Sequence, residues 1–288
     1  DQKAKNRMLE LVENLREAYR ISIEELDWMG DSTKVQAQEK LKKFRPKVGF
    51  PNEWKDYSNL VISKDDLIGN IKNSTLDRTI KNREKLGKPI DREEWGMTPQ
   101  TVNAYYSPLL NEIVFPAGIL QPPFFNMEAD DAVNYGAIGA VIGHEMGHGF
   151  DDKGSKYDGN GELRNWWTES DRKQFEERTK KLIDQYNGYT VVDGTPVNGE
   201  FTQGENIGDL AGIVIAYKAY QLSKKGSQAP IIDGLTGDQR FFFGWATIWG
   251  SKSTDEQLIR QIKTDPHSPG EFRANGPLVS MPEFVNLY

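Results

Sequence analysis

The residues that could do chemistry stand close together near the middle of the chain, at His144, Glu145 and His148. On a helix, histidines four residues apart project from the same face one turn apart, so both imidazoles could bind one metal ion. Glu145 lies beside them, where its carboxylate could take a proton from a metal-bound water. The alternative is a pair of buried histidines satisfied by hydrogen bonds alone. We favour the metal, because two imidazoles and an acid on an apolar helix have little other use.

A third ligand has to come from elsewhere, since a catalytic zinc ion usually has three protein ligands and one water. The chain has only three histidines and no cysteine, so a carboxylate is the best candidate. Glu205 and Asp209 lie one helical turn apart. Glu205 could complete the coordination, while Asp209 could accept the outer N–H of a ligand histidine and fix its orientation. Alternatively, these acids are a helix cap and an exposed side chain.

The elements that must position these residues are mostly helical. Residues 130–150 form a long apolar segment around the histidine pair, and its length predicts a buried helix. Its glycines at 136, 139 and 143 indicate that a neighbouring element approaches its backbone closely. Further helices are expected at 3–29, 32–44, 64–86, 169–187, 206–224, 237–250 and 254–262.

A small sheet is expected before the long apolar helix. Residues 101–106 and 111–115 have the composition of strands joined by a turn. A short extended run is expected at 57–62, and the prolines and glycine of 46–51 mark a loop. The predicted fold class is therefore mainly α with a small β-sheet, an α+β protein.

A possible cation loop begins at Asp158. Its acidic and amide residues, with Glu169 further on, have a spacing similar to a calcium loop. The sixth position is Leu163, where such a loop needs glycine. A turn leading to the helix at 169 is the better interpretation.

Composition excludes several function classes. The 288 residues, with 37% hydrophobic and 27% charged side chains, are typical of a globular protein of one large or two modest domains. No stretch reaches the ~20 apolar residues of a membrane span. The net charge of −7 argues against a nucleic-acid partner. Without cysteine, the chain cannot form disulfides, use a thiolate nucleophile or bind zinc through sulfur.

Several longer motifs accompany the histidine pair and extend over nearly the whole chain. They are VNAYY at 102–106, IVFPAGILQPPFF at 113–125, VIGHE at 141–145 with His148 and FDD at 150–152, GENIGD at 204–209, and KTD at 263–265 leading into HSPGEFR at 267–273. Together they resemble the neprilysin-like zinc metallopeptidases of peptidase family M13, which include bacterial endopeptidase O and the endothelin-converting enzymes. Gly147 departs from the family pattern, because threonine is usual there.

The resemblance implies a fold and a domain organisation. The family has a thermolysin-like, gluzincin catalytic domain that faces a second, helical domain across a cavity that admits peptides. Residues 93–288 would be the catalytic domain, and residues 1–92 a helical segment that belongs to or bridges to the second domain. The chain would then be the C-terminal part of a longer enzyme, with the missing N-terminal portion as a partner.

The resemblance also implies the catalytic centre. One Zn²⁺ per chain would be bound by His144, His148 and Glu205. Glu145 would polarise the water and Asp209 would support the site. His267 would steady the oxyanion of the tetrahedral intermediate, although its local sequence is also typical of a surface histidine in a turn between prolines.

Substrate-binding residues follow from the same resemblance. Asn103 and Ala104 match an edge strand that pairs with the substrate backbone, and Arg273 matches an arginine that binds a substrate carbonyl. Four positions match a pocket for a large apolar residue after the scissile bond, and simple core packing is their alternative role. These four are Ile119, Phe124, Val141 and Trp249.

The predicted function is that of a zinc-dependent endopeptidase hydrolysing short peptides, with a bulky apolar residue just after the cut. A second hypothesis is that this chain only binds zinc and peptides, because without the second domain the catalytic site would no longer be enclosed. Glu145 argues against a loss of chemistry by mutation, since decayed relatives typically lose the base. The lack of cysteine points to a bacterial homologue in the periplasm or at the cell surface, with the cytoplasm as the alternative.

Overall fold

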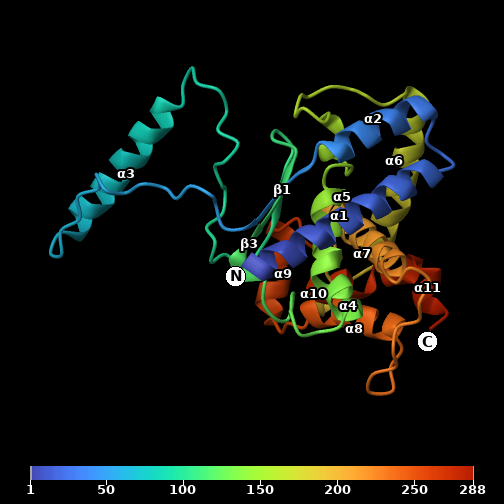
Figure 1. Ribbon diagram of the computed structural model, residues 1–288. Coiled ribbons are helices and arrows are strands. Elements are labelled where there is room, and N and C mark those ends of the chain that lie inside the picture. Colours follow the sequence, from blue (N-terminus) through green and yellow to red (C-terminus); the bar gives the residue numbers. More distant parts are fainter. Residues whose placement is uncertain (1, 288) are drawn as a thin grey trace. The chain divides into compact units, whose positions relative to one another are not determined.

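The computed structural model describes residues 2–287, which are mainly helical with one small sheet, as predicted (Figure 1). The described chain divides into two compact units, one made of residues 2–49 and 99–287 and the other of residues 50–98. Residues 2–49 therefore pack with the rest of the larger unit. The assignment of residues 1–92 to a second domain of the family stays a prediction.

The helices of the larger unit follow the predicted order, and their ends differ from the predicted ones by a few residues. They are α1 (Gln2–Glu25), α2 (Asp31–Lys42), α4 (Asp131–Asn134), α5 (Ala140–Gly147), α6 (Glu169–Asn187), α7 (Gln203–Ser223), α8 (Gly237–Ile248), α9 (Asp255–Thr264), α10 (Gly270–Asn275) and α11 (Pro282–Val285). Sequence periodicity missed α10 and α11, because each is too short to show a repeat.

The apolar segment expected as one helix over 130–150 has three parts. Helices α4 and α5 are joined by a buried π-helical turn, η2 (Tyr135–Gly139). The α-helix ends at Gly147, so His148 caps it and the residues after it form a loop. Such π-helical turns are rare and are frequently found at functional sites.

The sheet has three strands in the order β1-β3-β2. Strand β3 (Glu112–Pro116) pairs in parallel with β1 (Arg45–Gly49) and antiparallel with β2 (Tyr105–Ser107). The prediction of a strand over 101–106 is wrong at its beginning, because β2 begins only at Tyr105. The prediction of a loop over 46–51 is wrong, because residues 46–49 belong to strand β1. Its proline is tolerated because β1 lies at the edge of the sheet. Gly49, with φ of 85°, then ends the strand.

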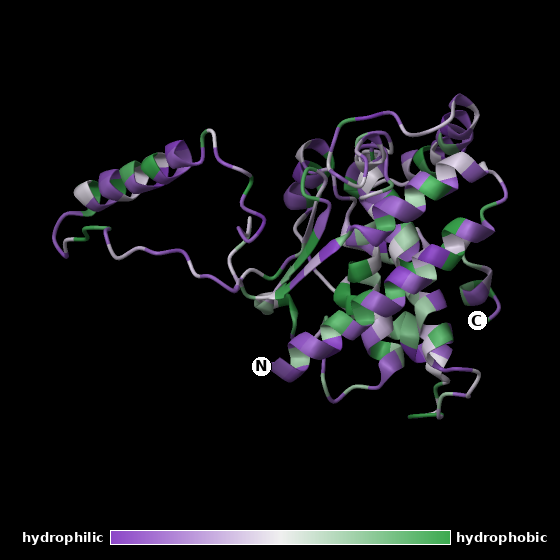
Figure 2. Ribbon diagram, turned by 45° about the horizontal axis from the view of Figure 1, so that its top comes forward, coloured by the Kyte–Doolittle hydropathy of each residue, from purple (hydrophilic) through white to green (hydrophobic). Residues whose placement is uncertain are grey.

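The core of the larger unit joins α1 to the helices around the histidine pair. The apolar stripe of α1, including Met8, Leu11 and Leu15, is fully buried in the same cluster as Ile142 of α5 and Ile213 of α7. In Figure 2 the hydrophobic ribbon of this unit gathers at its centre and hydrophilic stretches lie on its outer helices. The position of α5 therefore depends on α1 as well as on α7.

Helices α5 and α7 touch through glycines. A Cβ added to Gly143 would lie 2.7 Å from the carbonyl oxygen of Gly212, and one added to Gly212 would lie 2.5 Å from that of Ala140. Real Cβ atoms do not approach backbone so closely, so only glycine allows this helix crossing. The predicted close approach at Gly143 is confirmed.

The smaller unit consists of α3 (Leu67–Glu84) and the loops on either side. Asp66 caps α3 by accepting a hydrogen bond from the backbone N–H of Gly69. The predicted helix is confirmed, but residues 57–62 form a turn and irregular chain instead of an extended run. In the described part of the chain, no helix is both long enough and apolar enough to span a membrane.

Candidate active site

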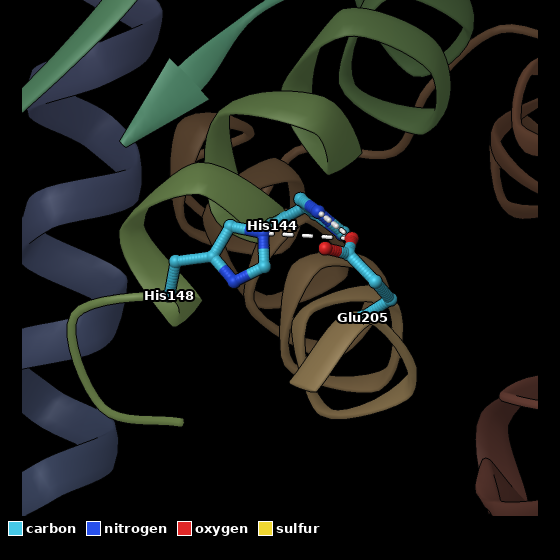
Figure 3. Close-up of side chains that lie close together, drawn as sticks. All are labelled: His144, His148 and Glu205. Carbon is cyan, nitrogen blue, oxygen red and sulfur yellow. Dashed lines mark ion pairs between the residues drawn. The ribbon is translucent and has the colours of Figure 1, made fainter. Parts of the chain in front are cut away.

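His144 and His148 lie at the end of α5, and Glu205 lies in the first turn of α7 (Figure 3). Their side chains point toward one another. The Nε2 atoms of His144 and His148 are 3.2 and 3.6 Å from Oε2 of Glu205. One possible ligand atom from each residue lies within 4.8 Å of the other two. The glycine contact between α5 and α7 brings these helices close enough for this cluster.

The outer nitrogens of both imidazoles are held by aspartates. Nδ1 of His144 is 2.8 Å from Oδ1 of Asp209, and Nδ1 of His148 is 2.7 Å from Oδ2 of Asp151. An Nδ1–H that donates to a carboxylate leaves the Nε2 lone pair facing the cluster. Oε2 of Glu205 is buried there without a hydrogen bond of its own.

These residues fit a zinc ion. Two neutral imidazole nitrogens and a carboxylate oxygen all present lone pairs to one point, which is unfavourable unless a cation lies between them. Two histidines and a glutamate are also a ligand set of catalytic zinc sites, which leave one coordination position for water.

The electrostatics of the cluster agree with a cation site. Burial would raise the pKa of Glu205, but its contacts with His144 and His148 outweigh burial and hold that pKa well below its usual range. Burial would likewise lower the pKa of His148, yet Asp151 and Glu205 keep it well above 6.5. Without a metal the imidazoles therefore attract protons, so metal and protons compete for the site.

Glu145 is buried beside the two ligand histidines. Burial raises the pKa of its carboxyl group, and the neighbouring histidines lower it without cancelling the effect. A carboxylate with a raised pKa is a better proton acceptor, which suits the role predicted for Glu145.

Asp209 connects the metal cluster to Arg273. Its carboxylate is 1% exposed and accepts hydrogen bonds of 2.6 and 2.7 Å from the Arg273 guanidinium. Burial alone would raise the pKa of Asp209, but the charge of Arg273 outweighs it and the pKa is lowered. The guanidinium carbon also lies 4.2 Å from the ring centre of Trp249. Arg273 therefore neutralises Asp209 as well as facing the cavity.

His267 lies between α9 and α10 and contacts the cluster through Glu205. Its Nε2 is 3.0 Å from Oε2 of Glu205, and its Nδ1 is 2.7 Å from Oδ1 of Asp265. The buried side chains of Asn206 and Ser268 form a 2.9 Å hydrogen bond that ties this segment to α7. The structure thus places His267 at the cavity, with its side chain still 43% exposed.

One cavity of about 350 Å³ collects every residue predicted for the site. Its predicted lining residues are Asn103, Ala104, Ile119, Phe124, Val141, His144, Glu145, His148, Glu205, Asp209, Trp249, His267 and Arg273. Asn103 and Ala104 lie just before β2, which begins at Tyr105, so they precede the edge strand and are not part of it. Their individual roles stay predictions.

Sequence reasoning missed the roles of two aspartates. Asp151 contacts Nδ1 of His148. Asp265 contacts Nδ1 of His267 and also accepts a hydrogen bond from the backbone N–H of His267. The available signal was an acid within three residues of each histidine. Tyr105, Tyr106 and Trp245 also line the cavity without having been predicted.

Comparison with known proteins agrees with this geometry. A sequence model described as Peptidase family M13 matches residues 103–288, and a second model of the same description matches residues 1–51. The chain belongs to peptidase family M13.

Relatives of this M13 chain include endothelin-converting enzymes of animals. The endothelin-converting enzyme homolog of Locusta migratoria is 40% identical in an alignment that covers 95% of this chain and 39% of that protein. Endothelin-converting enzyme 1 of Rattus norvegicus is 41% identical in an alignment that covers 98% of this chain and 38% of that enzyme.

Solved structures give the same result. The Mycobacterium tuberculosis zinc metalloprotease Zmp1 in complex with an inhibitor superposes with a TM-score of 0.96 at 58% identity, over 98% of this chain and 44% of that chain. PepO from Lactobacillus rhamnosis superposes with a TM-score of 0.90 at 34% identity, over 100% of this chain and 45% of that one. This M13 chain thus spans less than half the length of these relatives.

Proposed function

We propose that this M13 chain carries the catalytic centre of a zinc-dependent endopeptidase that hydrolyses short peptides before a bulky apolar residue. The observation that carries the proposal is the convergence of His144, His148 and Glu205 on one point, beside the buried carboxylate of Glu145. The similarity to a zinc metalloprotease of M. tuberculosis supports it.

In this proposal His144, His148 and Glu205 hold the zinc ion. Zinc bound there supplies a Lewis acid that polarises the scissile carbonyl and lowers the pKa of a water molecule. Asp209 and Asp151 keep the ligand imidazoles in their binding orientation through Nδ1.

The proton transfers fall to Glu145. Its carboxylate takes a proton from the attacking water and delivers it to the leaving amine. Glu205 and Asp265 raise the pKa of His267, which favours its protonated form. In that form His267 donates a hydrogen bond from Nε2 to the oxyanion of the tetrahedral intermediate, where negative charge develops. Arg273 positions the substrate through a backbone carbonyl, using the guanidinium edge that does not bond Asp209.

The preference for an apolar residue after the cut rests on the cavity wall. Ile119 is 3% exposed and belongs with Phe124, Val141 and Trp249 to the apolar side of the cavity. A large apolar side chain that packs against this wall is removed from water, and its burial is favourable by about 25 cal/mol per Å² of apolar surface.

Two further parts of the proposal concern the rest of the enzyme. Because the relatives are more than twice as long as the matched region, we propose that the chain works together with a further portion of an M13 enzyme. We also propose a bacterial source and a periplasmic or cell-surface location, which fits the lack of cysteine and the 58% identity to a mycobacterial protein.

The test combines metal analysis with peptide cleavage. The full chain should bind one zinc ion and cut a short peptide containing phenylalanine, with cleavage lost to a chelator and restored by zinc. Mass spectrometry should place the cut just before phenylalanine. Zinc and peptide binding without any cleavage would support the binding-only hypothesis, and a chain without zinc would contradict both.

Glu145→Gln separates chemistry from metal binding. Glutamine keeps the size of the side chain but cannot take the proton, so we expect unchanged zinc content and a loss of kcat by about 10²–10⁴-fold. Glu177→Gln, an exposed change on α6, is the control and should retain activity. Turnover within a few-fold of the parent would remove Glu145 from the mechanism.

A further inference from the structure

Lys40 of α2 is a buried lysine whose ammonium faces the loop after the metal-binding helix. It is 1% exposed. Its Nζ donates hydrogen bonds to the carbonyl oxygens of Gly149, Gly154 and Tyr157, at 2.6, 2.7 and 2.7 Å. An ammonium has three N–H donors. Every donor of Lys40 is therefore used on one loop.

Burial of this lysine is energetically unfavourable, because its ammonium group loses its contact with water. The rings of Tyr106, Phe150 and Trp166 surround it, with centroids 5.7–6.0 Å from Nζ. Burial lowers its pKa to about 7, although the charges of Asp151 and Asp158 act in the opposite direction. A methionine would fill the same space without desolvating a charge. The peptidase chemistry described above makes no use of Lys40.

The loop held by Lys40 carries the aspartate that orients His148. Oδ2 of Asp151 contacts Nδ1 of His148, and Oδ1 accepts hydrogen bonds from the backbone N–H groups of Lys153 and Gly154. Gly154 is thus bonded on both sides, with its N–H donating to Asp151 and its carbonyl accepting from Lys40. The path from Lys40 to the metal ligand is short and consists of hydrogen bonds.

Among the residues that the structure describes, no other hydrogen bond joins the two ends of this loop to α2. Gly149 directly follows His148, whereas Gly154 and Tyr157 lie at the far end. The ammonium of Lys40 accordingly bonds both ends of the loop and holds them close together. Asp151, whose carboxylate contacts the imidazole of His148, lies between those two ends.

We propose that Lys40 is a positioning residue of the metal site: by holding the carbonyls of Gly149, Gly154 and Tyr157, it keeps Asp151 against His148. The inference rests on the zinc site of the proposed function. Through this loop, residues 2–49 would also contribute to metal binding, in addition to their contribution to the core.

The first experiment compares two buried lysines. Lys47 of β1 is also buried, and it pairs with buried Glu112 at 2.9 Å. Lys40→Met should weaken zinc binding about 10–100-fold in competition with a chelator, as loss of an outer-shell contact does. The matched control, Lys47→Met with Glu112→Gln, removes a buried ammonium without leaving a charge and should keep zinc affinity within threefold of the parent. Unfolding of both zinc-free proteins in denaturant measures their stability separately.

A purely structural role for Lys40 predicts a different result. Both variants would then lose stability, while zinc affinity stayed at the parent value in both, and that result would overturn the proposal. A parent chain that binds no zinc would instead contradict the proposed function, so the two failures are distinguishable. If Lys40→Met does not fold, Lys40→Gln keeps two of the three donors and should show a smaller loss of zinc affinity in the same assay.

A double-mutant cycle tests the route. If Lys40 acts through Asp151, then Lys40→Met in an Asp151→Asn background should change zinc affinity by less than threefold, because the contact it protects is already weakened. Equal effects of Lys40→Met in both backgrounds would contradict the proposed path through Asp151.

Discussion

At the scale of single residues, the site repeats one arrangement. Each of the chain's three histidines has its Nδ1 within 2.7–2.8 Å of an aspartate oxygen, and each turns its Nε2 toward Oε2 of Glu205. Each aspartate fixes the ring plane of its histidine, and for the metal ligands His144 and His148 it also fixes the tautomer that leaves a lone pair on Nε2. The pairs are His144–Asp209, His148–Asp151 and His267–Asp265.

The arrangement around His267 leads to a kinetic prediction. A hydrogen-bond donor directed at charge that exists only in the transition state affects kcat far more than KM. We expect His267→Gln to lower kcat by about 10²–10³-fold, equivalent to ~2.7–4 kcal/mol, in steady-state peptide cleavage. Zinc content and KM should stay close to those of the parent. A variant that turns over within a few-fold of the parent would refute the oxyanion role.

At the scale of elements, the crossing of α5 and α7 determines where the ligands meet. Gly208 lies on α7 against the ring of His144, one residue before Asp209. The helices can approach this closely only because both carry glycine on the facing sides. Small changes at the crossing should therefore affect metal binding more than they affect the rest of the fold.

Gly208→Ala tests this dependence. The added Cβ would lie 2.8 Å from Nδ1 and Cε1 of His144, so the ring would have to move away from Asp209. We expect zinc affinity to fall about 10–100-fold in a chelator competition. The control is Gly139→Ala, whose Cβ would meet its neighbours at an ordinary 3.5 Å. If both variants bind zinc like the parent, the crossing is more adaptable than the geometry indicates.

Asp171 joins α6 to the connection between α1 and α2, and it leads to a pH prediction. Its carboxylate accepts hydrogen bonds from Gly30 N–H and from the Thr33 hydroxyl. Burial would raise the pKa of Asp171, but the bonds from Thr33, Thr168 and Gly30 outweigh it and lower the pKa below 3.8.

A lowered pKa in the folded state stabilises the protein above pH 3.8, and this contribution disappears as the pH falls through the folded-state value. Asp171→Asn should therefore reduce the free energy of unfolding by about 1.5–3 kcal/mol at neutral pH, for the loss of a charged hydrogen bond. The difference from the parent should shrink in acid. Exposed Asp184→Asn on the same helix should cost less than about 1 kcal/mol. A difference for Asp171→Asn that does not change with pH would contradict the assignment.

At the scale of the whole molecule, the larger unit is built from two stretches that are distant in the sequence. Residues 2–49 supply the buried stripe of α1, the edge strand β1 and the lysine that holds the loop after His148. Tyr19 of α1 also donates a 2.7 Å hydrogen bond to the carbonyl of Gly143, next to the first ligand. The cavity is lined by residues of the larger unit.

Removal of the first stretch should therefore abolish the site. Each buried Leu, Ile, Val, Phe or Met contributes about 1.5–3 kcal/mol, and the stretch holds several of them, whereas a whole domain is stable by only about 5–15 kcal/mol. We expect residues 99–288 alone to show no cooperative unfolding and no tight zinc binding, by circular dichroism and metal titration. Addition of residues 1–49 as a separate peptide should restore both. A zinc-binding, cooperatively folded 99–288 would show that the first stretch is dispensable.

Several features of this protein were predictable because they are local. The four-residue spacing of His144 and His148 places both on one helical face wherever the helix lies, and the same holds for Glu205 and Asp209. Helix positions followed from apolar periodicity, and Gly143 correctly indicated a close neighbour. Strand β1 was not predictable, because five residues with a proline have no decisive pattern and only pairing with β3 makes them a strand.

The tertiary structure decided which groups meet across elements, and in the sequence only the family resemblance indicated this, by assigning His267 and the zinc ligands to one site. No helical or strand periodicity shows that Asp151 turns back to His148, or that Lys40 lies against the loop after His148. Periodicity determines spacing within an element, whereas distances between elements depend on how the whole core packs, through contacts more than a hundred residues apart such as those of Lys40. The residue types of the site were therefore written in the sequence, and their partners were set by the packing of α1, α2, α5 and α7 against one another.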